Sequence, residues 1–224
     1  MLFSMNRLND NTDNIDALLS RAKECLIADG VDLDHDQVAK LRMHVELIRE
    51  WNEVVGLVST GDANALWERH VVDSLSLAGV IRRLGLESAR LYDVGSGGGF
   101  PAIPIKVALP ALRVDLIERS VKKVGFLRKV IAALALRDVT VHSMELSQFG
   151  QFDGASVVTA RAIENPRKAA AEIGFRLGGA SVFLSQLNLV FDDKFATERV
   201  EDQWTRAGLR RGSLDLVANR EAYG

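Results

Sequence analysis

The chain has one cysteine, no long hydrophobic run and no large excess of charge of either sign. The lone Cys25 excludes an internal disulfide and a cysteine-based zinc site, which fits a reducing compartment. No run approaches the ~20 apolar residues of a membrane-spanning helix, and the first ten residues contain no apolar core of a signal peptide. We therefore expect a cytoplasmic protein with no membrane partner and no metal site.

The balance of charge argues against a protein that is basic all over. The chain carries 28 Lys and Arg residues against 30 Asp and Glu residues, which gives a formal net charge of -2. Any contact with nucleic acid must then come from a local basic patch. With 224 residues, 47% of them hydrophobic, the chain is long enough to bury a full core, and we expect a monomer.

The hydrophobic pattern changes character near residue 85. Before it, apolar residues recur at intervals of three and four, which predicts helices over 14–28 and 36–51. A third helix is expected to begin at Asp62, a suitable N-cap, and to run to about Leu84, where Gly85 ends it. We predict an N-terminal helical extension over 1–85 and a second domain over 86–224.

Beyond residue 85, short apolar runs rich in β-branched residues alternate with helical patterns. Strands are predicted over 91–94, 114–117, 139–141, 155–159, 181–184 and 214–218. Helices are predicted over 102–109, 121–136, 166–176 and 192–207. This alternation indicates an α/β, Rossmann-like fold with a doubly wound, mostly parallel sheet, in which ligands bind beyond the carboxyl ends of the strands.

A glycine-rich loop follows the first predicted strand. The strand ends in Asp93-Val94 and is followed by Gly-Ser-Gly-Gly-Gly-Phe-Pro, with glycine at 95, 97 and 99. These glycines have no Cβ to keep a ligand off the backbone, and the helix behind them offers free N–H groups. The second strand ends in Glu118, where such folds place the carboxylate that binds a ribose.

The spacing of the loop narrows the choice of cofactor. It is Gly-x-Gly-x-Gly, whereas dinucleotide-binding loops have Gly-x-Gly-x-x-Gly, and the acid at 93 suits a cofactor with a cationic amino-acid end. S-adenosylmethionine is such a cofactor. After the third strand, Met144 and Glu145 place an apolar group beside an acid, which suits an adenine and its amino group.

Each of these signals also has a purely structural interpretation. The glycines can serve turn geometry alone, Glu118 can be a solvated strand end, Met144 can be packing and Glu145 a surface acid. The combination, in this order along the chain, favours a cofactor site that includes Gly95 and Gly97.

Five groups of residues carry a resemblance to a known family. They are Trp51-Asn52, Arg69-His70-Val71-Val72-Asp73-Ser74, Asp93 to Pro101, Lys122-Lys123 with Phe126-Leu127, and Ala160-Arg161-Ala162. Together they resemble the bacterial small-subunit ribosomal RNA guanine-N7 methyltransferases, also called glucose-inhibited division protein B. The glycine loop is generic to methyltransferases that use S-adenosylmethionine, whereas the Trp-Asn and Arg-His-x-x-Asp-Ser groups are specific to this family.

The resemblance implies a class I methyltransferase fold and S-adenosylmethionine as the cofactor. It implies methylation of one guanine at N7 in small-subunit ribosomal RNA, either free or in a ribosomal subunit precursor. It also implies that Gly95, Phe100, the Met144-Glu145 pair and Arg161 contact the cofactor, with Glu118 near its ribose.

The chemistry of guanine N7 limits what the enzyme must supply. N7 carries a lone pair and no proton, so no general base is assigned, and Arg161 and His70 remain candidate catalytic residues. Arg161 can hold the cofactor or RNA, or be a salt-bridged surface residue. Asp73 lies within one helical turn of Arg69 and His70, so a structural helix pair is an equal alternative to catalysis.

A basic cluster follows the second strand at the expected cofactor end. Lys122, Lys123 and Arg128 are its candidate contacts to RNA phosphates, and a solvated helix face is the alternative.

The chain departs from the family pattern at three places. After Trp-Asn it has Gly56-Leu57-Val58 where the family usually has Asn-Leu-Thr, and Ala102 replaces a glycine after Phe-Pro. The fifth strand ends in Leu184-Ser185-Gln186 where Leu-Lys-Gly is usual. Because polar groups are lost on the expected substrate side, two alternatives stay open: a methyltransferase for another RNA, a small molecule or a protein, and a non-catalytic module that binds cofactor or RNA.

Overall fold

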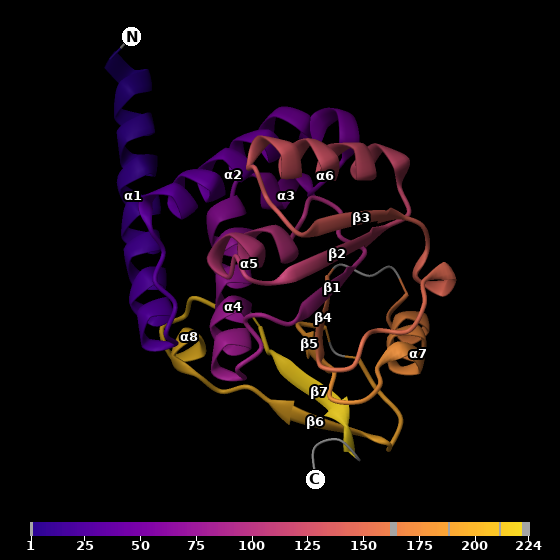
Figure 1. Ribbon diagram of the computed structural model, residues 1–224. Coiled ribbons are helices and arrows are strands. Elements are labelled where there is room, and N and C mark those ends of the chain that lie inside the picture. Colours follow the sequence, from indigo (N-terminus) through magenta and orange to yellow (C-terminus); the bar gives the residue numbers. More distant parts are fainter. Residues whose placement is uncertain (1, 162–164, 188, 211, 221–224) are drawn as a thin grey trace.

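The computed structural model describes residues 2–161, 165–187, 189–210 and 212–220, and its helices and strands are labelled in Figure 1. Within these ranges, seven strands form one sheet in the order β3-β2-β1-β4-β5-β7-β6. The strands are β1 (Arg90–Val94), β2 (Arg113–Glu118), β3 (Val139–Ser143), β4 (Ser156–Ala160), β5 (Val182–Ser185), β6 (Phe195–Arg199) and β7 (Asp215–Asn219). β1 to β5 pair in parallel, while β7 is antiparallel to both β5 and β6.

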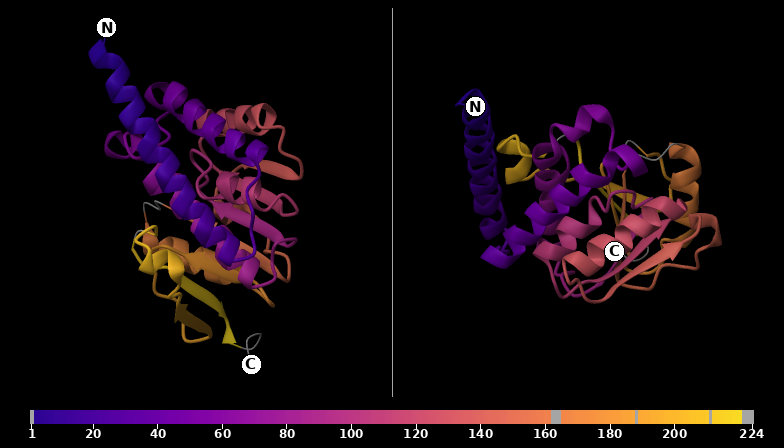
Figure 2. Two further views of the ribbon diagram at one scale, coloured as in Figure 1. Left: turned by 90° about the vertical axis from the view of Figure 1, so that its left-hand side faces the viewer. Right: turned by 90° about the horizontal axis from the view of Figure 1, so that it is seen from above.

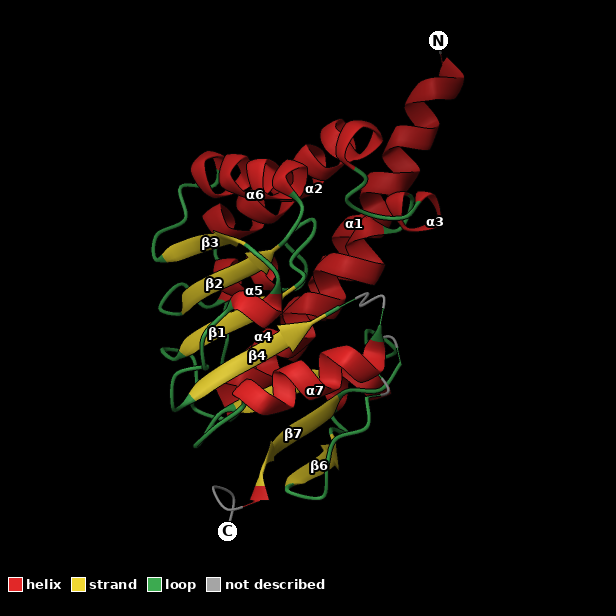
Figure 3. Ribbon diagram, turned by 90° about the vertical axis from the view of Figure 1, so that its right-hand side faces the viewer, coloured by secondary structure: helices red, strands yellow, loops and turns green. Residues whose placement is uncertain are grey.

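Helices cover both faces of this sheet. They are α1 (Leu2–Ala28), α2 (His35–Val55), α3 (Thr60–Ala63), the π-helix η1 (Trp67–Val72), α4 (Asp73–Arg83), α5 (Ala102–Ala108), α6 (Val121–Ala133), the 3-10 helix η2 (Leu146–Gln148), α7 (Pro166–Arg176) and α8 (Gln203–Arg206). α7 lies on one face and α4 and α5 lie on the other (Figure 3). α1 runs along α4, and its N-terminal end projects past the rest of the molecule (Figure 2). None of the described helices is long and apolar enough to span a membrane.

β1, β2, β4 and β5 are largely buried because neighbouring residues point to opposite faces of the sheet and helices cover both faces. Leu91 and Leu116 join the hydrophobic cluster that includes α4 and α5, whereas Tyr92 and Ile117 join the cluster that includes α7. The first cluster also contains residues of α1 and α2, so the N-terminal helices share a core with the sheet. The division into domains at residue 85 stays a prediction.

The predicted third helix is broken into three pieces. Ser59, not Asp62, caps its start, since the Ser59 side chain accepts a hydrogen bond from the Asp62 N–H. α3 then ends after one turn, and the chain continues as the wide turns of η1 before α4 begins at Asp73. The predicted end is correct, because Gly85 follows α4 with φ +70, a conformation that favours glycine.

The predicted helix over 192–207 is wrong. Phe195 to Arg199 form β6, which pairs with Asn219 to Asp215 of β7, and only Gln203–Arg206 are helical. The buried Phe195 ring packs near α7, and Asp202 caps α8 by accepting the N–H groups of Trp204 and Thr205. The segment forms a strand because it pairs with β7, which comes later in the sequence, and local periodicity does not show such a partner.

Candidate active site

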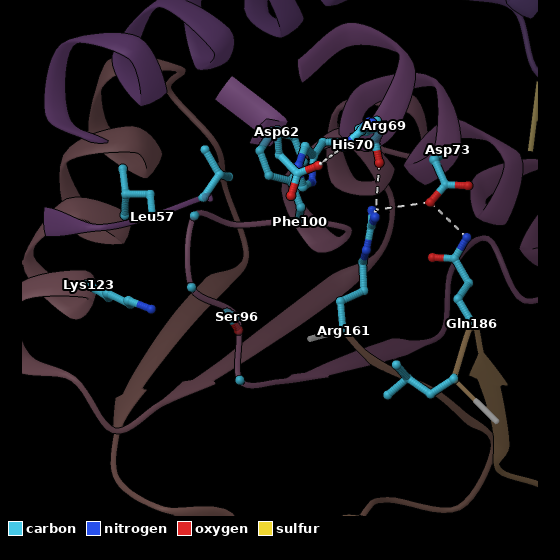
Figure 4. Close-up of a pocket in the computed structure, with 15 residues that line it drawn as sticks. Leu57, Asp62, Arg69, His70, Asp73, Ser96, Phe100, Lys123, Arg161 and Gln186 are labelled. Atoms are coloured by element: carbon cyan, nitrogen blue, oxygen red, sulfur yellow. Dashed lines mark hydrogen bonds and ion pairs between the residues drawn. The ribbon is translucent and has the colours of Figure 1, made fainter. Parts of the chain in front are cut away.

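Two neighbouring pockets lie at the carboxyl ends of the strands where the strand order reverses, between β1 and β4. The strand-end pocket, about 500 Å³, is lined by Val94, Gly95, Ile117, Glu118, Arg119, Ser120, Lys123, Met144, Glu145, Leu146, Arg161, Asn165, Lys168, Ala169 and Glu172. The π-helix pocket, about 410 Å³, is lined by Leu57, Val58, Asp62, Arg69, His70, Asp73, Gly95, Ser96, Gly97, Gly98, Phe100, Lys123, Arg161, Gln186 and Leu187 (Figure 4). Gly95, Lys123 and Arg161 line both, so the pockets are two parts of one site.

The glycine loop forms the floor between the two pockets. Gly95 has φ +72 and Gly97 has φ +51, in the left-handed region that residues with a Cβ avoid. A Cβ on Gly95 would meet no described atom within 4 Å, so its absence leaves room for a ligand against the backbone. On Gly98 a Cβ would come within 2.8 Å of Ile48 Cδ1, because α2 packs directly on the loop.

Glu118 connects the loop to the start of α6. Its Oε2 accepts the Gly97 N–H at 2.9 Å and its Oε1 accepts the Ser120 N–H at 2.8 Å. Each carboxylate oxygen keeps a second acceptor site after these bonds. Glu118 is buried but lines the strand-end pocket, so a ligand there can reach it.

Asp93 lies beneath the loop and is absent from the lining of both pockets. Its Oδ1 accepts the Thr159 hydroxyl at 2.7 Å, while Oδ2 has no hydrogen-bond partner among the described residues. Burial raises the pKa of Asp93 to about 7. The structure therefore places this acid under the pocket floor, and its predicted contact with a cationic cofactor end stays a prediction.

Met144 and Glu145 form one wall of the strand-end pocket. Met144 packs at the edge of the hydrophobic cluster below the pocket. Glu145 is exposed and lies 3.8 Å from the Arg119 guanidinium. The wall is therefore apolar on one side and carries acceptors on the other.

Phe100 stands between two histidine rings. Its ring centroid lies 4.6 Å from that of His44 and 4.8 Å from that of His70. Burial lowers the pKa of both histidines to about 4, and the positive charge of Arg161 adds to the effect on His70. Both imidazoles are therefore neutral at neutral pH. His44 Nε2 lies 2.8 Å from the Gly98 carbonyl oxygen, so this nitrogen carries the hydrogen.

Arg161 reaches from the end of β4 to the π-helix (Figure 4). Its Nη2 donates to the Arg69 carbonyl at 2.9 Å, and its Nη1 lies 3.3 Å from Asp73 Oδ2. The same Asp73 oxygen accepts Gln186 Nε2 at 2.9 Å. The helix pairing considered for Asp73 is replaced by these longer-range contacts, because Arg69 pairs with Asp62 at 2.7 Å and both ring nitrogens of His70 lack a partner in the described chain.

The predicted basic cluster divides into two parts. Lys123 lines both pockets, whereas Lys122 and Arg128 are exposed on α6 and lie outside them. Ala162, the last residue of the Ala-Arg-Ala group, lies outside the described residues. In the part of the chain that the structure describes, no three His, Cys, Asp or Glu side chains gather as metal ligands would.

Some contributors to the site were not predicted. His44 supports the loop from behind, and Asn165 and Lys168 of the α7 region line the strand-end pocket. A buried histidine on an apolar helix face gives no sequence signal of such a role. The Trp-Asn group does have a visible function, because Asn52 Oδ1 accepts the N–H groups of Leu57 and Val58 and so shapes a pocket wall.

A glycine loop at the switch point of a doubly wound sheet, with a carboxylate at the end of the next strand, defines a Rossmann-like cofactor-binding fold. The structure is similar to a mutant of MtNAS in complex with S-adenosylmethionine, with a TM-score of 0.56 and 18% identity over 93% of this chain and 91% of that one. It is also similar to magnesium protoporphyrin IX methyltransferase from Synechocystis PCC 6803, with a TM-score of 0.52 and 17% identity over 79% and 97%. The predicted class I methyltransferase fold is confirmed.

Sequence comparison narrows this class to a family. The chain belongs to the GidB family, rRNA small subunit methyltransferase G, whose model matches residues 37–178. The ribosomal RNA small subunit methyltransferase G of Sorangium cellulosum is 43% identical over 143 residues, which span 62% of this chain and 59% of that protein. The protein of the same name from Roseiflexus castenholzii is 36% identical over 181 residues, 76% and 74% of the two chains. The family resemblance carried by the sequence motifs is therefore confirmed.

Proposed function

We propose that this protein transfers a methyl group from S-adenosylmethionine to N7 of a guanine in small-subunit ribosomal RNA. Membership of the GidB family supports the proposal. The observation that carries it is the single site made by the two pockets, which share Gly95, Lys123 and Arg161. A methyl donor in the strand-end pocket and a base in the π-helix pocket would meet at these shared residues.

The residues of the strand-end pocket fit the cofactor. The open space at Gly95 admits a ligand to the backbone, and the free acceptor sites of Glu118 suit the two ribose hydroxyls. Met144 offers an apolar surface to the adenine, and Glu145 offers an acceptor to its amino group. A volume of about 500 Å³ suits a ligand of this size. When bound, the cofactor supplies an electrophilic methyl group on a sulfonium.

The work of the protein is then to orient the base. The N7 lone pair forms the new bond to the methyl carbon while the carbon–sulfur bond breaks, and no proton has to leave. Holding the two reactants in line contributes several of the ~7–11 kcal/mol available from approximation. Phe100 and the neutral His70 ring provide an aromatic wall for stacking, and Arg161 provides hydrogen-bond donors.

RNA contacts fit the exposed side of α6. Lys122 and Arg128 are exposed there, and Lys123 lies at the pocket itself. We assign these side chains to phosphate groups that flank the target base. We also infer that the protein acts as a monomer in the cytoplasm without a membrane partner, which size-exclusion chromatography and cell fractionation would check.

A labelled methyl donor tests the proposal against its alternatives. The protein is incubated with S-adenosylmethionine that carries a radioactive methyl group and with three separate acceptors: small-subunit RNA, cell protein and a small-molecule extract. We expect label in the RNA. Label only in protein or only in small molecules would mean that the protein is a methyltransferase for that substrate class. Binding of the cofactor with no label in any acceptor would indicate a non-catalytic binding module.

A further inference from the structure

Three side chains that line the π-helix pocket have buried polar atoms without a hydrogen-bond partner among the described residues. The four atoms are the two ring nitrogens of His70, Nη1 of Arg161 and Oε1 of Gln186. Buried polar groups in folded proteins are nearly always paired, because an unpaired one loses its hydrogen bonds to water without replacement. Three such residues around one pocket indicate an occupant that supplies the missing partners.

The orientation of the Gln186 amide is fixed by chemistry. Its Nε2 lies 2.9 Å from Asp73 Oδ2, and a carboxylate oxygen accepts but does not donate. The NH₂ group must therefore face Asp73, and the carbonyl oxygen Oε1 is the atom left over. Figure 4 shows this oxygen turned away from Asp73 and toward the side of the pocket where Arg161 lies.

The Arg161 donor lies near this acceptor, because both side chains contact the same Asp73 oxygen. Arg161 Nη1 is 3.3 Å from the same Asp73 oxygen that holds Gln186, and Nη2 is anchored on the Arg69 carbonyl. The Asp73 carboxylate thus positions an N–H donor that follows β4 next to a C=O acceptor that follows β5. A ligand edge that matches this pair has an acceptor and a donor on adjacent atoms.

We propose that Arg161 and Gln186 select guanine by its O6 and N1–H edge, Arg161 donating to O6 and Gln186 accepting from N1–H. The inference rests on the proposed function and names how its base is chosen. Adenine has an amino donor at position 6 and an acceptor at N1. Its donor would therefore face the Arg161 donor, and its acceptor would face the Gln186 acceptor. N7 lies on the other side of O6 from N1, so this edge is held while N7 stays free for methylation.

The mode of entry follows from the burial of the two atoms. Both are closed to water in this structure, so a base has to part the Gln186 and Arg161 side chains before it bonds to them. A donor and an acceptor that match the base reject a base with the reversed pattern much more strongly than shape alone does.

Nucleotide binding tests the inference without knowledge of the RNA target. The protein, saturated with S-adenosylhomocysteine, is titrated with guanosine, inosine and adenosine monophosphates and followed by NMR. Inosine shares O6 and N1–H with guanosine but lacks the 2-amino group. We expect guanosine and inosine to bind at least ~10-fold more tightly than adenosine. In Gln186→Leu the preference should fall below about twofold.

Two controls test whether the preference for guanosine and inosine depends on the Gln186 side chain itself. Gln151→Leu, the same change at an exposed residue outside both pockets, should keep the preference. Gln186→Leu should retain its affinity for S-adenosylhomocysteine, which shows that the fold and the strand-end pocket are intact. If the Gln186→Leu variant has a lower melting temperature than the wild type, the titration is repeated with Gln186→Met, whose side chain is unbranched and of similar length.

Equal binding of the three nucleotides, or an unchanged preference in the Gln186 variant, would overturn the inference. Binding of guanosine without inosine would also overturn it, because recognition would then depend on the 2-amino group. If the protein methylates small-subunit RNA but shows no preference for guanosine and inosine, the proposed function is supported and this inference is overturned. A preference that depends on Gln186, without methyl transfer to that RNA, supports the inference and overturns the proposed substrate.

Discussion

Glu118 has a structural role in the glycine loop and a proposed role in the cofactor site. Its carboxylate receives the N–H groups of Gly97 and Ser120, so it fixes the glycine loop against the end of β2. The remaining acceptor sites face the strand-end pocket. A negative charge in this position strengthens any hydrogen bond from a hydroxyl donor.

The Glu118→Gln variant should lose affinity for S-adenosylhomocysteine. The amide replaces one charged acceptor with a donor and removes the charge, and hydrogen bonds to charged groups contribute about 1.5–3 kcal/mol each. We expect the dissociation constant from calorimetry to rise at least ~10-fold. Glu53→Gln on the exposed side of α2 is the matched control. Equal affinity in the two variants would remove Glu118 from the cofactor site.

His44 makes stability depend on pH. Burial lowers its pKa from 6.5 to about 4, so the unfolded chain takes up a proton below about pH 6.5 that the folded protein does not. The free energy of unfolding should therefore decrease as the pH falls from 6.5 to 4, by about 3 kcal/mol for this residue.

The test compares the wild-type protein with His44→Gln, in which an amide N–H can still reach the Gly98 carbonyl. Urea unfolding at several pH values in this window should give a smaller decrease in the variant than in the wild type. Identical decreases would mean that His44 is not held neutral by the fold.

The residues of the site were predicted unevenly. The glycines, Glu118 and the Met144-Glu145 pair follow strand ends, so their gathering at one sheet edge is visible in the order of the sequence. The bond between Gln186 and Asp73 joins residues 113 positions apart. Nothing local in either segment indicates this bond, and Gln186 was singled out only as a departure from the family pattern.

At the level of elements, prediction succeeded where local pattern and packing agree. The parallel strands β1, β2, β4 and β5 are largely buried and are followed by clear turn signals, whereas the edge strand β3 is only partly buried. Prediction failed for η1 and β6, which depend on contacts with distant segments. α8 and the adjoining chain are held by a buried polar network that reaches the end of α1, in which Asp29 accepts Trp204 Nε1 at 2.7 Å and also binds Gln203 and Arg83.

Asp29→Ala should destabilise the protein by about 2–4 kcal/mol. The substitution leaves the buried Trp204 N–H without its partner and removes one carboxylate from Arg83. Thermal melting should show a clear decrease, while the exposed Asp32→Ala changes stability by less than ~0.5 kcal/mol. A melting temperature equal to that of the wild type would show that the network does not hold α8 to α1.

Over the whole molecule, the charge is nearly balanced, so the proposed RNA binding has to rest on a local surface. The exposed face of α6 beside the pockets is our assignment for that surface. Because Lys122 and Arg128 lie outside both pockets, they can be changed without altering the cofactor site.

The double variant Lys122→Glu, Arg128→Glu should bind small-subunit RNA more weakly while its affinity for S-adenosylhomocysteine stays the same. If both side chains contact phosphates, the slope of log affinity against log salt should also become shallower by about 1–2. Filter binding at several salt concentrations measures both quantities. Unchanged RNA affinity and slope would place the RNA on another face.

We propose that the two pockets together bring a methyl donor to guanine N7. The most direct measurement incubates the protein with S-adenosylmethionine and with small ribosomal subunits or their free RNA, digests the RNA and identifies its nucleosides by mass spectrometry. New 7-methylguanosine should appear only when both the protein and the cofactor are present. A methylated nucleoside of any other kind, or none while the protein binds the cofactor, would contradict the proposal.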